Sequence, residues 1–216
     1  MRVPGPPLLI VTDRRQARRP LADVVAAAIK GGCRWISVRE KDLAADEQVL
    51  LARALIPAAH AQGARLTIHG DAALAAAAGV DGVHLPAGSD AAAARALLGE
   101  DKLIGISIHT VTEAHGIDPA SVDYVLAGPA FETASKPGYG PELGRKGLSE
   151  IARVAHVPVL AIGGINTARI ADLIAEGAAG VGVMGSVMRA SDPERETAAL
   201  LSTLTGSLAI RGRDRY

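Results

Sequence analysis

Hydroxyl and ammonium groups gather in the stretch Gly128–Lys136, which reads GPAFETASK. It follows the apolar run Asp123–Ala127, which is typical of a buried strand. A Gly-Pro pair at its start predicts a tight turn, after which come Thr133, Ser135 and Lys136. Hydroxyl donors beside a cation suit an anionic oxygen cluster such as a phosphate group. Taken alone, the stretch fits an ordinary polar loop equally well.

Groups of the same kind follow other apolar runs that we expect to be strands. They are Thr12-Asp13, Arg39-Glu40-Lys41, His69 with Asp71, His84, Ser107 with His109, Gly163-Gly164 and Gly185-Ser186. Glycine turns can bring backbone N–H groups close to a phosphate. Three cations around one hydroxyl, namely two from the Arg-Glu-Lys triplet and Lys136, suit a pyrophosphate or a substrate with two anionic ends.

Each of these groups also has an ordinary structural interpretation. Arg39 and its neighbours could solvate a loop, and the paired glycines could be a mere turn. His84 lies within an apolar strand, where a hydrogen-bonded core histidine is the commoner case. His109 lies just past a strand end, where an acid–base role and an ordinary loop position are equally plausible. No Cys/His spacing indicates a structural metal site.

The elements that must position these groups alternate along the whole chain. Short β-branched runs are followed by longer Ala- and Leu-rich runs, in eight strand–helix units. The strands are continuously apolar, as in a parallel sheet that is covered on both faces. We therefore expect an α/β protein, a single-domain (β/α)8 TIM barrel over residues 1–206, with a doubly wound open sheet as the alternative. In a barrel the active site lies at the carboxyl ends of the strands, so the groups above would meet at one rim.

Two helix boundaries carry further expectations. Asp71 and Asp90 each precede an Ala-rich helical run, where an aspartate can cap the helix. The last helix is expected to end near Leu204, and residues 207–216 are expected to form a frayed basic tail.

Composition excludes several classes of protein. The 216 residues are 49% hydrophobic, which is enough for a sizeable core, and Lys+Arg and Asp+Glu balance at 23 each. This balance and the shortage of aromatic residues argue against nucleic-acid binding. The single cysteine, Cys33, excludes an internal disulfide and fits a reducing compartment. Because the apolar run Pro6–Val11 is too short for a signal or membrane segment, we expect a soluble cytoplasmic protein. The sequence is compatible with either a monomer or a homo-oligomer.

Five segments, in order, resemble the thiamine phosphate synthase superfamily, which includes the TenI-type thiazole tautomerases. They are VREK at Val38–Lys41, DGVHL at Asp81–Leu85, IGIS at Ile104–Ser107, GPAFETASK at Gly128–Lys136 and AIGGI at Ala161–Ile165. The likeness covers nearly the whole chain and implies a (β/α)8 barrel. For the synthase branch it implies an enzyme of thiamine biosynthesis. That transferase joins a hydroxymethylpyrimidine pyrophosphate to a thiazole phosphate and releases pyrophosphate.

The resemblance also implies roles for individual residues. Those implied to hold the pyrophosphate are Arg39, Lys41, Ser107 and Lys136. Those implied to contact the thiazole substrate and its phosphate are Thr133, Ser135, Gly164, Gly185 and Ser186. Fixed cations that meet the negative charge growing on the leaving oxygens would lower the barrier.

Some positions depart from the synthase pattern. A glutamine of the family is replaced by Ser37, and an Asn-Asp pair is replaced by His69-Gly70, which makes His69 a candidate substrate-binding residue. A second family aspartate is replaced by Ser89. The two family aspartates hold magnesium. Asp71 and Asp90 each lie one residue later and are the candidate ligands here, with Mg²⁺ as the implied cofactor.

The resemblance leaves alternatives open. The triplet Phe131–Thr133 is closer to the tautomerase branch, which has a histidine where this chain has Pro129. In a thiazole tautomerase, an isomerase, His109 or His69 would have to transfer the proton. A non-catalytic binder of a phosphorylated heterocycle is the third possibility. In all three cases the partners are small phosphorylated heterocycles.

Overall fold

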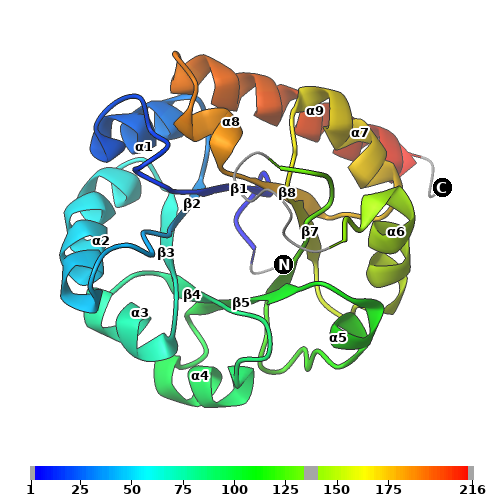
Figure 1. The fold of residues 1–216 in the computed structure, drawn as a ribbon, viewed down its shortest axis with the longest axis horizontal. Coiled ribbons are helices and arrows are strands. Elements are labelled where there is room, and N and C mark those ends of the chain that lie inside the picture. Colours follow the sequence, from blue (N-terminus) through cyan, green and yellow to red (C-terminus); the bar gives the residue numbers. More distant parts are fainter. Residues whose placement is uncertain (1–2, 134–140, 214–216) are drawn as a thin grey trace.

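The computed structural model describes residues 3–133 and 141–213. Parallel strands follow one another in chain order around a closed barrel, and helices surround them (Figure 1). The predicted (β/α)8 barrel is confirmed, and an open sheet is excluded because the first strand pairs with the last. The strands are β1 (Leu8–Val11), β2 (Trp35–Val38), β3 (Arg65–His69), β4 (Gly82–Leu85), β5 (Leu103–Ile108), β6 (Tyr124–Ala127), β7 (Val159–Ile162) and β8 (Gly180–Val183).

Each strand is followed by a helix, and β8 is followed by the short α8 and the long α9. Helix α9 packs beside α7 and α1 and so completes the ring of helices (Figure 1). The helices are α1 (Leu21–Lys30), α2 (Ala45–His60), α3 (Ala72–Ala78), α4 (Ala91–Leu98), α5 (Val111–His115), α6 (Gly144–Val154), α7 (Thr167–Ala175), α8 (Gly185–Met188) and α9 (Pro193–Arg213). Within the described ranges, none of them has both the length and the apolar character that a membrane crossing needs.

Strands β1, β2, β6 and β7 each contribute to two apolar cores, because successive strand residues point to opposite faces of the sheet. In β1, Leu8 and Ile10 pack outward beneath the helices, whereas Leu9 and Val11 pack inside the barrel. Full burial of one such aliphatic side chain contributes about 1.5–3 kcal/mol. The alternation explains why the strands read as continuously apolar.

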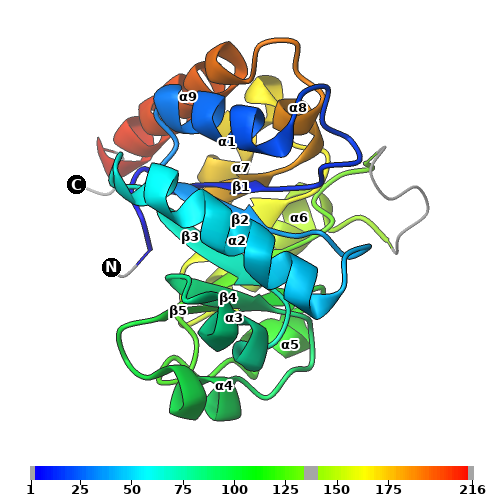
Figure 2. The ribbon, with the colours of Figure 1, turned by 90° about the vertical axis from the view of Figure 1, so that its left-hand side faces the viewer.

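The barrel interior is filled by two large aromatic side chains. Trp35 and Tyr124 meet edge to face, with ring centroids 4.6 Å apart. Gly105 makes room for the tyrosine, since a Cβ at that position would lie 2.0 Å from Cζ of Tyr124. Val3 belongs to the same interior cluster. The first described residues lie at the end of the barrel opposite the carboxyl ends of the strands (Figure 2).

Side-chain caps set the starts of three helices on one side of the barrel. The Asp71 carboxylate accepts a hydrogen bond from Leu74 N at 2.7 Å, at the start of α3. The Asp90 carboxylate accepts one from Ala93 N at 2.9 Å, at the start of α4. Both predicted caps are therefore confirmed, and each contributes about 1 kcal/mol. A capping box that begins at Thr110 starts α5.

The end of the chain differs from the sequence-based expectation. Helix α9 continues past Leu204 as far as Arg213, so the described part of the basic tail is helical rather than frayed. Leu208 packs against the core, and Arg211 Nη1 donates to a backbone carbonyl next to β8 at 2.7 Å. These long-range contacts anchor the extra turns. Residues 214–216 lie outside the described part of the chain.

Candidate active site

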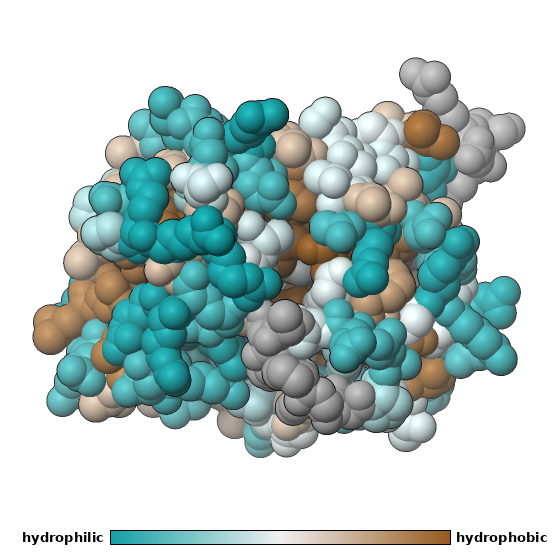
Figure 3. All heavy atoms as spheres, turned by 45° about the horizontal axis from the view of Figure 1, so that its top comes forward, coloured by the Kyte–Doolittle hydropathy of each residue, from teal (hydrophilic) through white to brown (hydrophobic). Residues whose placement is uncertain are grey.

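A cavity of about 600 Å³ opens at the carboxyl ends of the strands. Figure 3 shows hydrophilic side chains around a hollow in which apolar surface is visible at depth. Pockets for small ligands typically measure about 300–1,000 Å³. The cavity is therefore large enough for the small heterocycles that the sequence suggests.

Most of the predicted site residues converge on this cavity. The described ones that line it are Arg39, Lys41, His69, Ser107, His109, Thr133, Gly164, Gly185 and Ser186. Asp71 and Asp90 are not among the lining residues. Ser135 and Lys136 lie outside the described residues, so their predicted roles stay predictions.

Two cations reach the cavity from the end of β2, and a buried carboxylate organises the turn that carries them. The Thr12 hydroxyl donates to Glu40 Oε1 at 2.6 Å and accepts from Arg39 N at 2.9 Å. Glu40 also accepts from Arg14 N at 2.9 Å. Burial raises the pKa of the Glu40 carboxyl, and the hydrogen bond from Thr12 opposes that rise. Because Glu40 points into the protein, Arg39 and Lys41 on either side of it line the cavity.

The electrostatic environment of Lys41 favours the binding of an anion beside it. Its pKa is lowered, first by partial burial and then by the nearby charge of Arg39. Both effects disfavour the ammonium form. An anion bound between Lys41 and Arg39 would reverse the second effect and favour the charged form.

On the side of β4 to β6, three side chains form a hydrogen-bonded row. Ser107 Oγ lies 2.9 Å from His84 Nε2, and His84 Nδ1 lies 3.2 Å from the Tyr124 hydroxyl. The His69 ring lies beside the His84 ring, with centroids 5.0 Å apart. Burial lowers the pKa of His84 well below its usual value, and the charges of His69 and Arg39 lower it further. His84 is therefore a neutral core histidine, as expected, but one that also lines the cavity.

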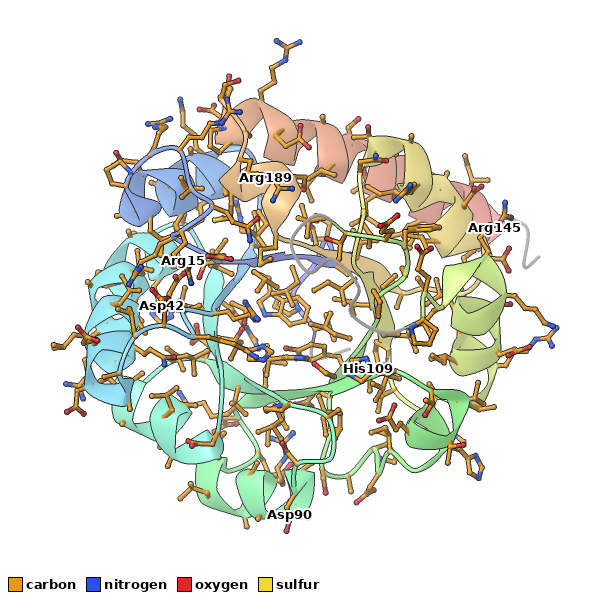
Figure 4. The ribbon with its side chains drawn as sticks, in the orientation of Figure 1. Arg15, Asp42, Asp90, His109, Arg145 and Arg189 are labelled. Carbon is orange, nitrogen blue, oxygen red and sulfur yellow. The ribbon has the colours of Figure 1, made fainter. Side chains whose placement is uncertain are left out.

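His109 is held in one orientation at the cavity edge (Figure 4). Its Nδ1 lies 2.5 Å from the carbonyl oxygen of Gly128. Because a carbonyl only accepts, Nδ1 must carry the proton, and the lone pair of the neutral ring is on Nε2. The backbone N–H of His109 donates to Glu113 Oε2 at 2.6 Å, which fixes the residue further. An imidazole held in this way has the chemistry of an acid–base group.

Two glycines after β7 form a tight turn at the cavity wall. Gly163 and Gly164 have φ values of 104° and 63°, which other residues rarely adopt. A Cβ on Gly164 would also lie 2.4 Å from the carbonyl oxygen of Glu132. Arg169 Nη1 donates to the Gly164 carbonyl at 2.6 Å, and its guanidinium lies 4.4 Å from the centroid of the Phe131 ring. Because Gly163 and Gly164 carry no side chains of their own, a ligand in the cavity can approach the backbone of this turn closely.

After β8, the first turn of α8 completes the wall. The Ser186 hydroxyl is buried and has no hydrogen-bond partner among the described residues, although Ser186 lines the cavity. A buried hydroxyl without a partner costs about 1–3 kcal/mol, a penalty that a ligand oxygen would remove. The guanidinium of Arg189 lies against Gly185 and donates to the Gln16 side chain. Figure 4 shows Arg189 beside α8.

The two candidate metal ligands lie elsewhere. Asp71 and Asp90 are exposed, and one oxygen of each carboxylate accepts from its own helix. Figure 4 shows Asp90 at the outer end of α4, away from the barrel opening. Across residues 3–133 and 141–213, no group of three or more His, Cys, Asp or Glu side chains is arranged to hold a metal ion. Metal binding by these aspartates stays a prediction.

Several lining residues were not predicted from the sequence. They are Glu132, Asn166, Arg169 and Arg189. Asn166 and Arg169 lie at the start of α7, and helix starts in a barrel face the same mouth as the strand ends, so this position was the available signal. Arg189 follows α8, which is too short for any periodic pattern to predict.

Known proteins are similar to this chain in sequence and in fold. The family model described as thiamine monophosphate synthase matches residues 8–187. A thiamine-phosphate synthase of Roseiflexus sp. (strain RS-1) is 41% identical over 208 residues, which cover 94% of this chain and 87% of the relative. One of Chlorobium luteolum is 38% identical over 212 residues, with coverages of 96% and 97%.

A solved structure of thiamine phosphate pyrophosphorylase from Pyrococcus furiosus superposes with a TM-score of 0.82 and 28% identity. The superposition covers 93% of this chain and 96% of that one. With a family match over most of the chain and relatives near 40% identity, the chain belongs to the thiamine monophosphate synthase family.

Proposed function

We propose that the protein is a thiamine phosphate synthase. This transferase couples hydroxymethylpyrimidine pyrophosphate to a thiazole phosphate and releases pyrophosphate. The observation that carries the proposal is that one cavity is lined by two sets of groups whose chemistry suits anions. Arg39, Lys41 and Ser107 form one group, and the glycine turns with the unpartnered hydroxyl of Ser186 form the other. The family membership supports the same reaction.

The charges of the first group suit the bond that must break. As the C–O bond between the pyrimidine methylene and the pyrophosphate opens, its electron pair moves onto the leaving oxygen. A pyrimidine-stabilised cation remains, and the thiazole nitrogen captures it by forming a C–N bond. Arg39 and Lys41 oppose the charge that grows on the pyrophosphate, and Lys136 is predicted to do the same. Holding both substrates in one cavity removes much of the entropic barrier.

The second group suits the phosphate of the thiazole substrate. Backbone N–H groups in the first turn of a helix have no partner within the helix. Gly185 and Ser186 provide such groups, and the Ser186 hydroxyl adds a donor. The phosphate would therefore be held mainly by neutral donors, while the cations remain for the pyrophosphate.

The described residues do not fit a carboxylate site for magnesium. Asp71 and Asp90 cap helices outside the cavity, and Glu132 is the one carboxylate among the described lining residues. The segment 134–140 contains no acidic residue. We derive no catalytic step through magnesium from this donor set.

Asparagine substitutions test the magnesium assignment without removing the caps. Asn caps a helix about as well as Asp, so Asp71→Asn and Asp90→Asn should fold normally while losing a carboxylate. If neither carboxylate binds metal, the Mg²⁺ dependence of coupling stays unchanged in both variants. We also expect Lys136→Ala to weaken pyrophosphate binding more than Asp71→Ala does. An equal or reversed order would mean that Asp71 does bind metal.

The central experiment supplies both substrates and measures thiamine phosphate and pyrophosphate together. We expect product only when both substrates are present. Arg39→Ala should raise the KM of the pyrimidine substrate, and Ser186→Ala that of the thiazole phosphate. Failure to couple at every Mg²⁺ concentration would reject the proposal. Double-bond migration in a thiazole phosphate carboxylate, without pyrophosphate, would identify a tautomerase instead, and binding without turnover a non-catalytic protein.

A further inference from the structure

A row of three side chains runs from the barrel interior to the cavity wall. The Tyr124 hydroxyl contacts His84 Nδ1 at 3.2 Å, and His84 Nε2 contacts Ser107 Oγ at 2.9 Å. Tyr124 and His84 are both 0% exposed, whereas Ser107 is partly exposed and lines the cavity. The row therefore has one end sealed in the core and one end open to a ligand.

The sealed end sets the direction of the hydrogen bonds. Burial raises the pKa of Tyr124, so its hydroxyl keeps the proton. Within the described part of the chain, His84 Nδ1 is the hydrogen-bond partner of that hydroxyl, and no other is found. A buried O–H that lacks an acceptor is strongly disfavoured. Tyr124 must therefore donate, and His84 Nδ1 must accept.

The tautomer of His84 then sets the direction of its hydrogen bond with Ser107. His84 is neutral, since burial lowers its pKa and the charges of His69 and Arg39 lower it further. A neutral imidazole has one N–H group. Because Nδ1 accepts, Nε2 carries the proton and donates a hydrogen bond to Ser107 Oγ. The opposite direction would leave the Tyr124 proton unpaired in the core, whereas this one leaves the Ser107 proton in the cavity.

We propose that Tyr124 and His84 fix the polarity of Ser107, so that its hydroxyl donates to an anionic oxygen of the substrate. The inference rests on the proposed function, in which Ser107 contacts the pyrophosphate. Tyr124 and His84 are positioning residues that act through the serine. A serine that rotates freely can donate or accept, but this one is kept as a donor. It therefore favours phosphate oxygens over ligand groups that only donate.

The tautomer of His84 can be measured in the free protein. Nitrogen NMR on protein with ¹⁵N-labelled imidazoles should show a protonated Nε2 and a bare Nδ1 for His84. The pattern should persist across the pH range in which exposed histidines titrate. The Ser107→Ala variant assigns the resonance, because it changes the partner of Nε2. A protonated Nδ1 would overturn the inference, and this outcome does not depend on whether the protein couples the two substrates.

A double-mutant cycle tests the consequence for binding. Tyr124→Phe keeps the ring and removes the donor, and it should weaken the binding of inorganic pyrophosphate roughly tenfold by calorimetry. Ser107→Ala should weaken it at least as much. In the Ser107→Ala background, Tyr124→Phe should cause no further loss, because its effect passes through the serine. Fully additive losses would overturn the inference.

Trp35→Phe is the matched control. Trp35 packs against the same tyrosine ring but takes no part in the row of hydrogen bonds. This variant should keep both the His84 tautomer and the affinity for inorganic pyrophosphate. If it weakened binding as much as Tyr124→Phe, packing rather than polarity would explain the effect. If Tyr124→Phe fails to fold, the NMR measurement on the natural sequence decides.

Discussion

Replacing Gly105 by alanine adds one methyl group against the Tyr124 ring in the barrel interior. The new Cβ would lie 2.0 Å from Tyr124 Cζ and 2.3 Å from Cε1, whereas carbon atoms in contact normally lie about 3.5–4.0 Å apart. The ring or the strand must therefore shift by more than about 1 Å. The tyrosine has little freedom to turn away, because Trp35 packs against it and His84 binds its hydroxyl.

The expected loss of stability follows from these contacts. Overpacking of a filled core costs about 1–3 kcal/mol, and disturbing the buried Tyr124–His84 hydrogen bond costs about 1–3 kcal/mol more. Gly105→Ala should therefore lower the free energy of unfolding by about 2–6 kcal/mol. For a domain of this size that corresponds to a fall in Tm of about 5–20 °C.

Urea unfolding followed by circular dichroism measures this loss, with Gly206→Ala as the matched control. Gly206 lies in α9, and a Cβ there would meet no atom within 4 Å. The same glycine-to-alanine change should stabilise this helix by up to about 1 kcal/mol. The two variants are thus expected to shift stability in opposite directions. If Gly105→Ala were as stable as the natural protein, the account of the barrel interior given above would be wrong.

Two further predictions concern ionisable groups. Burial raises the pKa of Glu113, but hydrogen bonds from His109 N and from Thr110 outweigh it, so the net pKa is lowered. The carboxylate therefore adds stability at pH values above its unfolded pKa. The natural protein should have a higher free energy of unfolding than Glu113→Gln at neutral pH, and this difference should disappear as the pH falls through the folded pKa. A difference that stays unchanged in acid would contradict this prediction. Burial raises the pKa of the Cys33 thiol to about 12. Iodoacetamide should therefore modify the native protein at least about a hundredfold more slowly than the urea-unfolded chain, as followed by mass spectrometry, and similar rates would count against a buried thiol.

Local sequence patterns predicted most of the fold because they reflect local physics. The strand and helix order follows from hydrophobic periodicity, and the caps Asp71 and Asp90 bind backbone only three residues away. The short α8 and the last turns of α9 were not predictable in this way. They depend on contacts between distant segments, such as the hydrogen bond from Arg211 to Ala178.

The candidate site divides in the same way. The sequence by itself determined which residues follow each strand, and the carboxyl ends of parallel strands in a barrel meet at one rim. It therefore determined much of the rim, including Arg39, Lys41 and Ser107. It also determined the family motifs. The same reasoning could not place Asp71, which does not line the cavity although His69, two residues earlier, does.

Only the tertiary structure decided which of these side chains face the cavity and how they are paired. Glu40 points inward between two cations because Thr12, 28 residues away, binds its carboxylate. His84 has both nitrogens engaged because Tyr124 and Ser107, 40 and 23 residues away, reach it through the register of neighbouring strands. Such pairings depend on barrel closure and strand register, which bring distant residues together and leave no periodic trace in the chain.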